Sequence, residues 1–173
     1  MNKRLDEKTV AILHPDLGIG GAEQLILNVA LALQSEGARV RMYTPRFDPQ
    51  RCFDECQEID IEVVGSWIPR HLFGRCFALM AYIRMLFCAI HVALFGGRYD
   101  YIVLDQVSFP IPILRLFNRN VIFYCHYPDK LLCVERTSIL KKIYRFFLDL
   151  FEEISTACAK VILVNSKFTR GVF

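Results

Sequence analysis

Six short apolar runs, separated by segments whose apolar residues recur at helical spacing, constrain this chain more than any other feature. The runs lie at residues 9–14, 38–44, 59–65, 101–106, 120–126 and 160–166. Apolar strands that alternate with helices form a mostly parallel sheet with both faces covered. With right-handed crossovers, the pattern predicts an α/β fold with a Rossmann-like, doubly wound sheet, and 173 residues are enough for one such domain.

Helices are expected in the segments between these strands. Apolar residues recur at helical spacing after Gly21, and Gly37 is a natural end for that helix. A second strong helical pattern begins beyond Ser138, which is a candidate N-cap. A further helix begins after Ser166, for which a capping role is favoured over a ligand contact.

A glycine-rich turn, HPDLGIGGAEQL, joins the first strand to the first helix. Gly18, Gly20 and Gly21 permit positive φ and close approach of a ligand, and the helix start that follows offers free N–H groups to a phosphate or diphosphate. The GxGG spacing is not the dinucleotide GxGxxG, and no P-loop lysine follows, which disfavours NAD and ATP. A tight turn without a ligand is an equal alternative, in which Glu23 serves only the helix dipole.

His126, in FYCHYPDKLL, directly follows the fifth strand at the sheet edge where ligands of such folds collect. Its imidazole is a candidate catalytic group that contacts a substrate hydroxyl or exchanges a proton, with Asp129 as a substrate-binding neighbour. Asp105 and Gln106 follow the fourth strand and are further substrate-binding candidates. The alternative for His126 is a strand-end cap bonded to the backbone, and His14 is expected only to shape the turn.

Charge and cysteine content disfavour several classes of function. The net charge of +3 suits an anionic lipid surface or a phosphorylated ligand but is too weak to indicate nucleic acid. Seven scattered cysteines, mostly among apolar residues, indicate buried reduced thiols on the cytosolic side. Cys52 and Cys56 form a CxxxC pair, but no second pair follows at zinc spacing, so neither a metal site nor a cofactor is expected.

A long apolar segment, LFGRCFALMAYIRMLFCAIHVALF at residues 72–95, has the length needed to cross a bilayer. Arg75 and Arg84 disfavour a transmembrane span, because a charge in hydrocarbon is costly. As a helix, the segment places Arg84, Cys88 and His91 on one stripe among apolar residues. Two alternatives stay open: a core crossover helix, or a helix that packs on the sheet while Arg75 and Arg84 meet lipid phosphates at a membrane surface.

Several motifs, in this order, resemble the N-terminal half of retaining GT-B glycosyltransferases of family 4. The motifs are LHPDLGIGGAEQLILNVALALQ, YTPRFDPQRCF, DQVS, FYCHYPDKLL and VNSKFT. Within the family, the resemblance is strongest to the α-1,3/1,6-mannosyltransferases of dolichol-linked oligosaccharide assembly. It implies that residues 1–173 form the N-terminal, acceptor-side Rossmann-like domain of a GT-B enzyme, and that the C-terminal donor-binding domain is absent from this chain.

The resemblance implies transfer of mannose from GDP-mannose to a mannosylated GlcNAc2-diphospho-dolichol, in α-1,3 and α-1,6 linkage. The implied location is the cytosolic face of the endoplasmic reticulum membrane. Gly20 and Gly21 would approach the donor diphosphate or the transferred sugar, and His126 matches a histidine near that sugar and the attacking hydroxyl. The chain alone is expected to be inactive, because the donor-site residues belong to the C-terminal half. The alternatives are a non-catalytic truncated form that binds a lipid surface, and a GT-B enzyme for another sugar or lipid acceptor.

Overall fold

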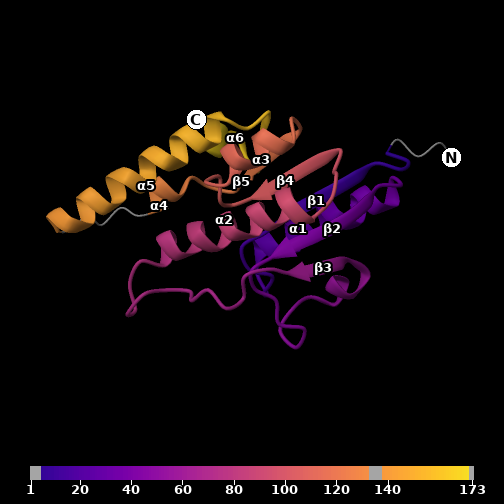
Figure 1. Ribbon diagram of the computed structural model, residues 1–173, viewed down its shortest axis with the longest axis horizontal. Coiled ribbons are helices and arrows are strands. Elements are labelled where there is room, and N and C mark those ends of the chain that lie inside the picture. The colour runs from indigo at the N-terminus through magenta and orange to yellow at the C-terminus, as the bar shows by residue number, and fades with distance from the viewer. Residues whose placement is uncertain (1–4, 133–137, 172–173) are drawn as a thin grey trace.

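The computed structural model describes residues 5–132 and 138–171, which contain six strands in one parallel sheet (Figure 1). The strands are β1 (Thr9–Leu13), β2 (Arg39–Thr44), β3 (Asp60–Val63), β4 (Tyr101–Asp105), β5 (Val121–Cys125) and β6 (Val161–Val164). Their order across the sheet is β3-β2-β1-β4-β5-β6, and all neighbouring pairs are parallel. This is the doubly wound order, so the predicted α/β fold and the six predicted strands are confirmed.

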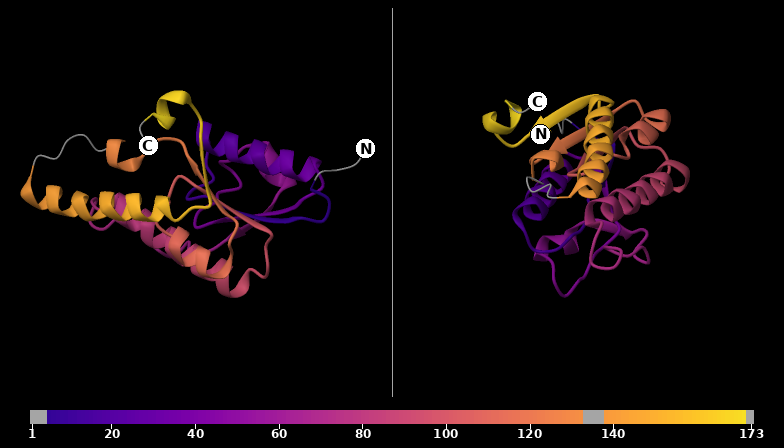
Figure 2. Two further views of the ribbon diagram at one scale, coloured as in Figure 1. Left: turned by 90° about the horizontal axis from the view of Figure 1, so that it is seen from above. Right: turned by 90° about the vertical axis from the view of Figure 1, so that its left-hand side faces the viewer.

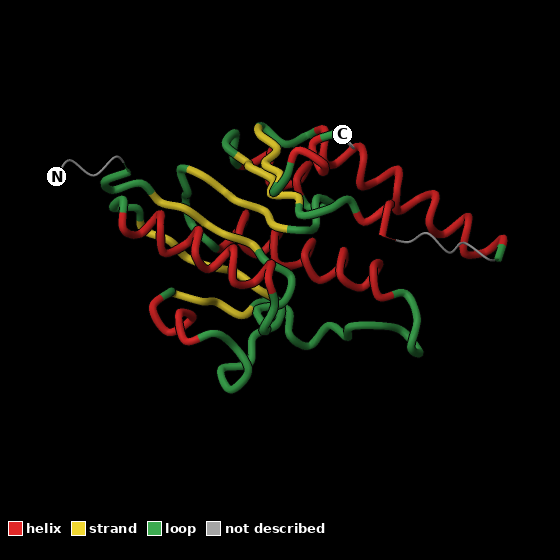
Figure 3. Tube along the Cα trace, turned by 180° about the vertical axis from the view of Figure 1, so that it is seen from behind, coloured by secondary structure: helices red, strands yellow, loops and turns green. Residues whose placement is uncertain are grey.

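Helices cover both faces of the sheet. They are α1 (Gly21–Ser35), the 3₁₀ helix η1 (Asp54–Glu58), α2 (Phe77–Phe95), α3 (Ile111–Phe117), α4 (Asp129–Leu132), α5 (Ile139–Ala157) and α6 (Lys167–Arg170). Seen from above, α1 lies on one side of the sheet, and α2, α3 and α5 lie on the other (Figure 2). Figure 3 shows the α1 side from behind. Because neighbouring strand residues point to opposite faces, Ala11 and Leu13 join the core beneath α2, while Val10 and Ile12 join the core beneath α1.

Local sequence signals set several helix boundaries as predicted. Ser138 Oγ accepts a hydrogen bond from the Lys141 N–H (3.2 Å) at the start of α5. Ser166 Oγ accepts one from the Thr169 N–H (3.0 Å) at the start of α6. These caps satisfy amide groups that the first helical turn leaves unpaired. Gly37 follows α1 with φ of +98°, a conformation that favours glycine.

The apolar segment 72–95 is only partly helical. α2 begins at Phe77, because Phe73, Gly74 and Cys76 adopt positive φ (49°, 69° and 58°) in the loop before it. α2 has the length and composition of a membrane span, but 39% of its most apolar window is buried within the protein. Its buried residues, among them Met80, Met85, Cys88 and Val92, belong to the core with residues of β1 and β4, so the helix packs on the sheet as a crossover between β3 and β4. η1, α3 and α4 are short helices with too few turns for a clear periodic pattern, so the sequence predicted no bounds for them.

α5 exposes its apolar side and buries part of its polar side. Eight of its apolar residues are at least 40% exposed: Ile139, Leu140, Ile143, Phe146, Phe147, Leu150, Phe151 and Ile154. Their spacing places them on one stripe of the helix, whereas Arg145, Glu152 and Ser155 are buried against the rest of the protein. An uncovered apolar stripe of this length marks a surface that contacts a partner or a membrane.

Candidate active site

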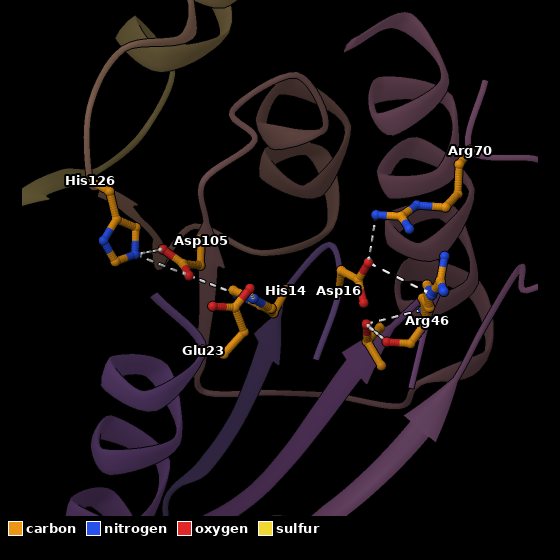
Figure 4. A network of polar contacts seen from close by, with 8 residues as sticks. His14, Asp16, Glu23, Arg46, Arg70, Asp105 and His126 are labelled. Atoms are coloured by element: carbon orange, nitrogen blue, oxygen red, sulfur yellow. Dashed lines mark hydrogen bonds and ion pairs between the residues drawn. The ribbon is translucent and has the colours of Figure 1, made fainter. Parts of the chain in front are cut away.

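Three neighbouring strands end in titratable side chains that meet at one edge of the sheet. The β1–β4 register pairs Leu13 with Leu104, so the next residues, His14 and Asp105, lie side by side. His14 Nδ1 is 2.7 Å from Asp105 Oδ2, and both side chains are fully buried. His126 follows β5 and places its Nε2 3.0 Å from Asp105 Oδ1 (Figure 4). The parallel strands thus bring two histidines onto one carboxylate.

The first turn of α1 extends this cluster. Glu23 Oε1 lies 3.9 Å from His14 Nε2, which completes a polar chain Glu23–His14–Asp105–His126 from α1 to the end of β5. The side chains of Glu23 and His126 are 21% and 22% exposed, while the two inner members are fully buried. Of these four residues, only the outer two are therefore accessible to a ligand.

The cluster holds opposite charges in a buried position. Burial lowers the pKa of His14, but the interactions with Asp105 and Glu23 outweigh burial and raise this pKa to about 9. Burial raises the pKa of Asp105, but His126 and His14 more than offset this effect, and the net shift is downward. The pKa of Glu23 is also lowered, chiefly by His14. At neutral pH, His14 is therefore an imidazolium, and His126 donates its Nε2–H to an ionised Asp105.

The raised pKa of His14 predicts a loss of stability on the alkaline side. A histidine with a pKa of 6.5 in the unfolded chain and about 9 in the folded protein stabilises the fold fully below pH 6.5. This contribution, about 3 kcal/mol in the free energy of unfolding, disappears as the pH rises through 9. Urea denaturation at several pH values across this range measures the slope of the free energy of unfolding against pH.

The matched variant for this measurement is His14→Gln, which should flatten the slope between pH 6.5 and 9. Burial raises the pKa values of the Cys88 and Cys125 thiols to about 12, so these thiols add a pH dependence only above their ordinary value of 9.0. Equal slopes in the wild type and in His14→Gln would contradict the role assigned to His14.

The glycine turn lies where it was predicted but has a different backbone conformation. Gly20 is the N-cap of α1 with an extended backbone (φ −171°), and none of Gly18, Gly20 and Gly21 adopts positive φ. The turn therefore does not use the positive φ that its glycines permit. A Cβ at Gly20 would overlap Glu23 Oε2, so glycine is needed here for the Glu23 carboxylate to fold back over the turn. Cβ atoms at Gly18 and Gly21 would meet open space.

Gly20→Ala should separate Glu23 from His14. The added methyl group displaces the flexible carboxylate, and the pKa of His14 should move down from about 9 while Asp105 keeps it above 6.5. An NMR titration of the His14 ring signals measures the shift. Gly21→Ala adds the same methyl group to open space and is the control. An unchanged His14 titration in Gly20→Ala would show that Glu23 contributes nothing.

A cavity of about 330 Å³ opens beside His126 at the same edge of the sheet. Gln106 and Asp129 line it together with His126, so three of the predicted site residues share one cavity. A larger hollow of about 510 Å³ lies around Asp100, at the amino ends of the strands and away from His126. Ligands of doubly wound sheets bind at the carboxyl ends, so the cavity beside His126 is the candidate site.

The predicted substrate-binding residues differ in how available their side chains are. Gln106 adopts φ of +63°, a conformation that is uncommon for residues other than glycine and gathers at functional sites. Asp129 accepts a hydrogen bond from Arg145 Nη1 (2.9 Å), which ties it to α5. Asp105 is not exposed at all, so its carboxylate contacts His14 and His126 rather than the ligand that was predicted for it.

The two arginines predicted to contact a membrane have different surroundings. Arg75 is exposed in the loop before α2, close in sequence to Phe73, whose side chain is 99% exposed. Arg84 is only 7% exposed, because the stripe that it shares with Cys88 faces the body of the protein. The predicted membrane contact of Arg84 is therefore wrong. Arg84 lies at the wall of the cavity beside His126 instead.

Sequence reasoning underestimated His14 and Glu23. It gave His14 the shaping of a turn and Glu23 a helix-dipole role, whereas the structure places both in the chain that leads to His126. The available signal was positional: His14, Asp105 and His126 each directly follow a strand, and the doubly wound order makes those three strands neighbours.

Within residues 5–132 and 138–171, no group of three His, Cys, Asp or Glu side chains suits a metal ion. The six described cysteines are free thiols, and Cys56, Cys88 and Cys125 among them are buried. The seventh, Cys133, lies outside the described residues.

Comparison with known proteins gives the family. The model of Glycosyltransferase Family 4 matches residues 19–173. This chain belongs to glycosyltransferase family 4. The α-1,3/1,6-mannosyltransferase ALG2 of Dictyostelium discoideum is 52% identical over 100% of this family 4 chain, and its Homo sapiens counterpart is 48% identical over 95%. The chain spans only 42% and 41% of the length of these two relatives. The predicted resemblance is confirmed.

Solved structures agree on the fold of this family 4 chain. Sucrose-phosphate synthase from Thermosynechococcus elongatus has a TM-score of 0.67 at 16% identity, over 95% of this chain and 44% of that chain. WaaG, a glycosyltransferase involved in lipopolysaccharide biosynthesis, has a TM-score of 0.56 at 11% identity, over 94% of this chain and 40% of that chain. The expected fold, one Rossmann-like unit of a GT-B glycosyltransferase, is confirmed.

Proposed function

We propose that this family 4 chain forms the acceptor-side domain of a retaining mannosyltransferase. The enzyme moves mannose from GDP-mannose to a mannosylated GlcNAc2-diphospho-dolichol, in α-1,3 and α-1,6 linkage. One observation carries the proposal: an imidazole held by a buried carboxylate lines a cavity at the sheet edge, in a chain 52% identical to an α-1,3/1,6-mannosyltransferase. We assign the nucleotide-sugar donor to a second domain, because the Dictyostelium discoideum relative is more than twice as long as this chain.

His126 is the residue that we assign to the acceptor. The ionised Asp105 accepts its Nε2–H, which leaves Nδ1 as a hydrogen-bond acceptor when the ring is neutral. No described residue bonds Nδ1, so this nitrogen is available to orient the attacking hydroxyl. In a retaining transfer, the incoming hydroxyl and the leaving diphosphate lie on the same face of the sugar. A residue that orients the hydroxyl therefore also brings it close to the group that takes its proton.

The start of α1 is our candidate for stabilising the leaving diphosphate. Gly18 and Gly21 leave open space around the turn, and the first amides of α1 carry partial positive charge towards it. Because Glu23 folds back over Gly20, a diphosphate bound here shares the helix start with that carboxylate. The His14 imidazolium offsets the charge of Glu23, which reduces the repulsion of the incoming anion.

A lipid-linked acceptor requires the site to lie near a membrane. Two apolar surfaces lie at the end of the molecule where the strands end: the exposed stripe of α5 and the loop before α2 (Figure 1). The loop region presents Phe73 and Phe77, which are 99% and 56% exposed, with Arg75 between them in sequence. Apolar side chains beside a cation suit the boundary of acyl chains and lipid phosphates. We therefore propose that this end contacts the cytosolic face of the endoplasmic reticulum membrane.

The function is tested by measuring transfer of labelled mannose to a lipid-linked, mannosylated chitobiosyl diphosphate. GDP-mannose, UDP-glucose and UDP-N-acetylglucosamine should be compared as donors for the full-length enzyme. Transfer from GDP-mannose supports the proposal, and transfer from another nucleotide sugar alone would assign a different specificity. These 173 residues by themselves should transfer nothing, because they span only 42% of the length of the Dictyostelium discoideum relative and we assign the donor to the remainder of the enzyme.

The apolar stripe of α5 also supports a second candidate, a non-catalytic protein that binds a lipid surface. Binding to anionic vesicles without mannose transfer by the full-length protein would favour this candidate. Vesicle binding together with transfer would favour the enzyme.

A further inference from the structure

We propose that Arg46, Arg70 and Arg84 form a binding site for a diphosphate ester, where the cavity that contains His126 adjoins a smaller hollow. The inference rests on the proposed function, because it names residues that would hold the diphosphate of one of that enzyme's substrates. Its core is a buried cation for which the described part of the fold provides no partner.

Arg84 is that cation. It is 7% exposed, its Nε is buried, and within the described residues no hydrogen bond or ion pair reaches its guanidinium. Burial lowers its pKa, and the charges of Arg70 and Arg46 lower it further, while Asp16 acts in the opposite direction. A buried charge without a partner is destabilising, and an anion in the cavity would remove that cost.

The three arginines surround two adjoining hollows. Arg70 and Arg84 line the cavity of about 330 Å³ that His126 also lines. Both also line a neighbouring hollow of about 170 Å³, to which Arg46 contributes. Arg84 therefore reaches both spaces from the buried side of α2, and Arg70 reaches both from the loop that follows β3. Arg46 borders only the smaller space, from the loop that follows β2.

Asp16 is the carboxylate that Arg46 and Arg70 share. Its Oδ2 lies 3.4 Å from Arg70 Nη2 and 3.8 Å from Arg46 Nε (Figure 4). The side chains of Arg46 and Arg70 are 46% and 56% exposed, so both can turn towards a ligand. Three guanidinium groups and one carboxylate leave a local charge of +2.

A local charge of +2 suits a diphosphate ester. Guanidinium groups bind phosphate oxygens through two parallel hydrogen bonds, and arginine keeps its charge in buried places better than lysine does. The neighbouring hollow of about 400 Å³ adds Arg51, Asp48 and Glu23. The charges of Arg51 and Asp48 cancel, and that of Glu23 is offset by the His14 imidazolium. The proposed function offers two sources of the ligand, the lipid-linked acceptor and the nucleotide-sugar donor.

Calorimetric titration of this chain with inorganic pyrophosphate tests the site. Arg84→Met should weaken binding about tenfold or more, and Arg70→Gln should weaken it severalfold. Arg39→Gln is the matched control, because this exposed arginine at the amino end of β2 carries the same charge on the opposite edge of the sheet. Its affinity for pyrophosphate should equal that of the wild type.

Thermal melting separates ligand binding from a structural role. Arg84→Met removes an unpaired buried charge and keeps an apolar side chain of similar length, so its melting temperature should stay the same or rise. A lower melting temperature with unchanged pyrophosphate affinity would overturn the proposal. If Arg84→Met does not fold, Arg70→Gln provides the test instead, because the Arg70 side chain is exposed. An unchanged affinity of Arg70→Gln for pyrophosphate also overturns the proposal.

Farnesyl diphosphate and GDP distinguish the two sources. Tighter binding of farnesyl diphosphate assigns the site to the lipid-linked acceptor, and tighter binding of GDP assigns it to the donor. Sulfate that binds as tightly as pyrophosphate, or no binding of any diphosphate, overturns the site. None of these titrations needs mannose transfer. Diphosphate binding without transfer would reject only the proposed function, and transfer unaffected by Arg84→Met would reject only this site.

Discussion

Asp105→Ala should destabilise the protein by about 3–5 kcal/mol, the largest stability effect expected at the site. The substitution removes the carboxylate that lies 2.7 Å from His14 and 3.0 Å from His126. His14 is fully buried and its pKa is raised to about 9, so it carries a proton at neutral pH that then lacks its main partner. Urea denaturation at pH 7 measures the loss.

The loss should shrink as the pH rises through 9, because His14 is then neutral in the wild type as well. Asp60→Ala is the matched control. Its carboxylate is 56% exposed and pairs with Arg41 (2.6 Å), and an exposed pair is worth about 0.2–1 kcal/mol. Equal losses in the two variants would show that burial of the Asp105 cluster adds nothing to the stability of the fold.

His126→Ala should lower the rate of mannose transfer by about 10²–10⁴-fold in the full-length enzyme, while the fold survives. His126 is the accessible end of the polar chain, and we assign its Nδ1 to the attacking hydroxyl. Its side chain is 22% exposed, so truncation should cost about 1 kcal/mol or less in stability. The rate of transfer and a urea denaturation curve together measure the two effects.

His91→Ala is the control for that comparison. His91 also pairs with a carboxylate, Glu62 (2.7 Å), but it lies on the distant half of α2 and lines no wall of the cavity beside His126. Its transfer rate should match that of the wild type. An unchanged rate of mannose transfer in His126→Ala would show that this residue takes no part in the mechanism and only caps the end of β5.

The strands were predictable because they are determined locally. Each buried strand is a short apolar run, such as TVAIL in β1 and VIFYC in β5, and neither run depends on distant residues to be recognised. The helix caps at Ser138 and Ser166 were predictable for the same reason, since a serine side chain bonds an amide three residues away. The need for glycine at position 20 was not predictable in this way, because it comes from the Glu23 side chain that folds back over the turn.

The orientation of the helices was not predictable in the same way. The sequence places Arg84 on a stripe of α2 and the apolar residues of α5 on another, but a stripe does not say which side meets the sheet. In the folded protein, Arg84 faces inward, and the apolar stripe of α5 faces outward. Both outcomes reverse the usual preference for buried apolar and exposed charged side chains.

The sequence by itself determined the fold class, the six strands, the edge of the sheet that holds the site, and the family. These follow from periodicity and from motifs that are contiguous in the chain. Only the tertiary structure decided that His14 and His126 share Asp105, and that Arg46 and Arg70 gather around Asp16. The physical reason is that the strand register and the loop paths set these distances, and each pair joins residues that the chain keeps far apart.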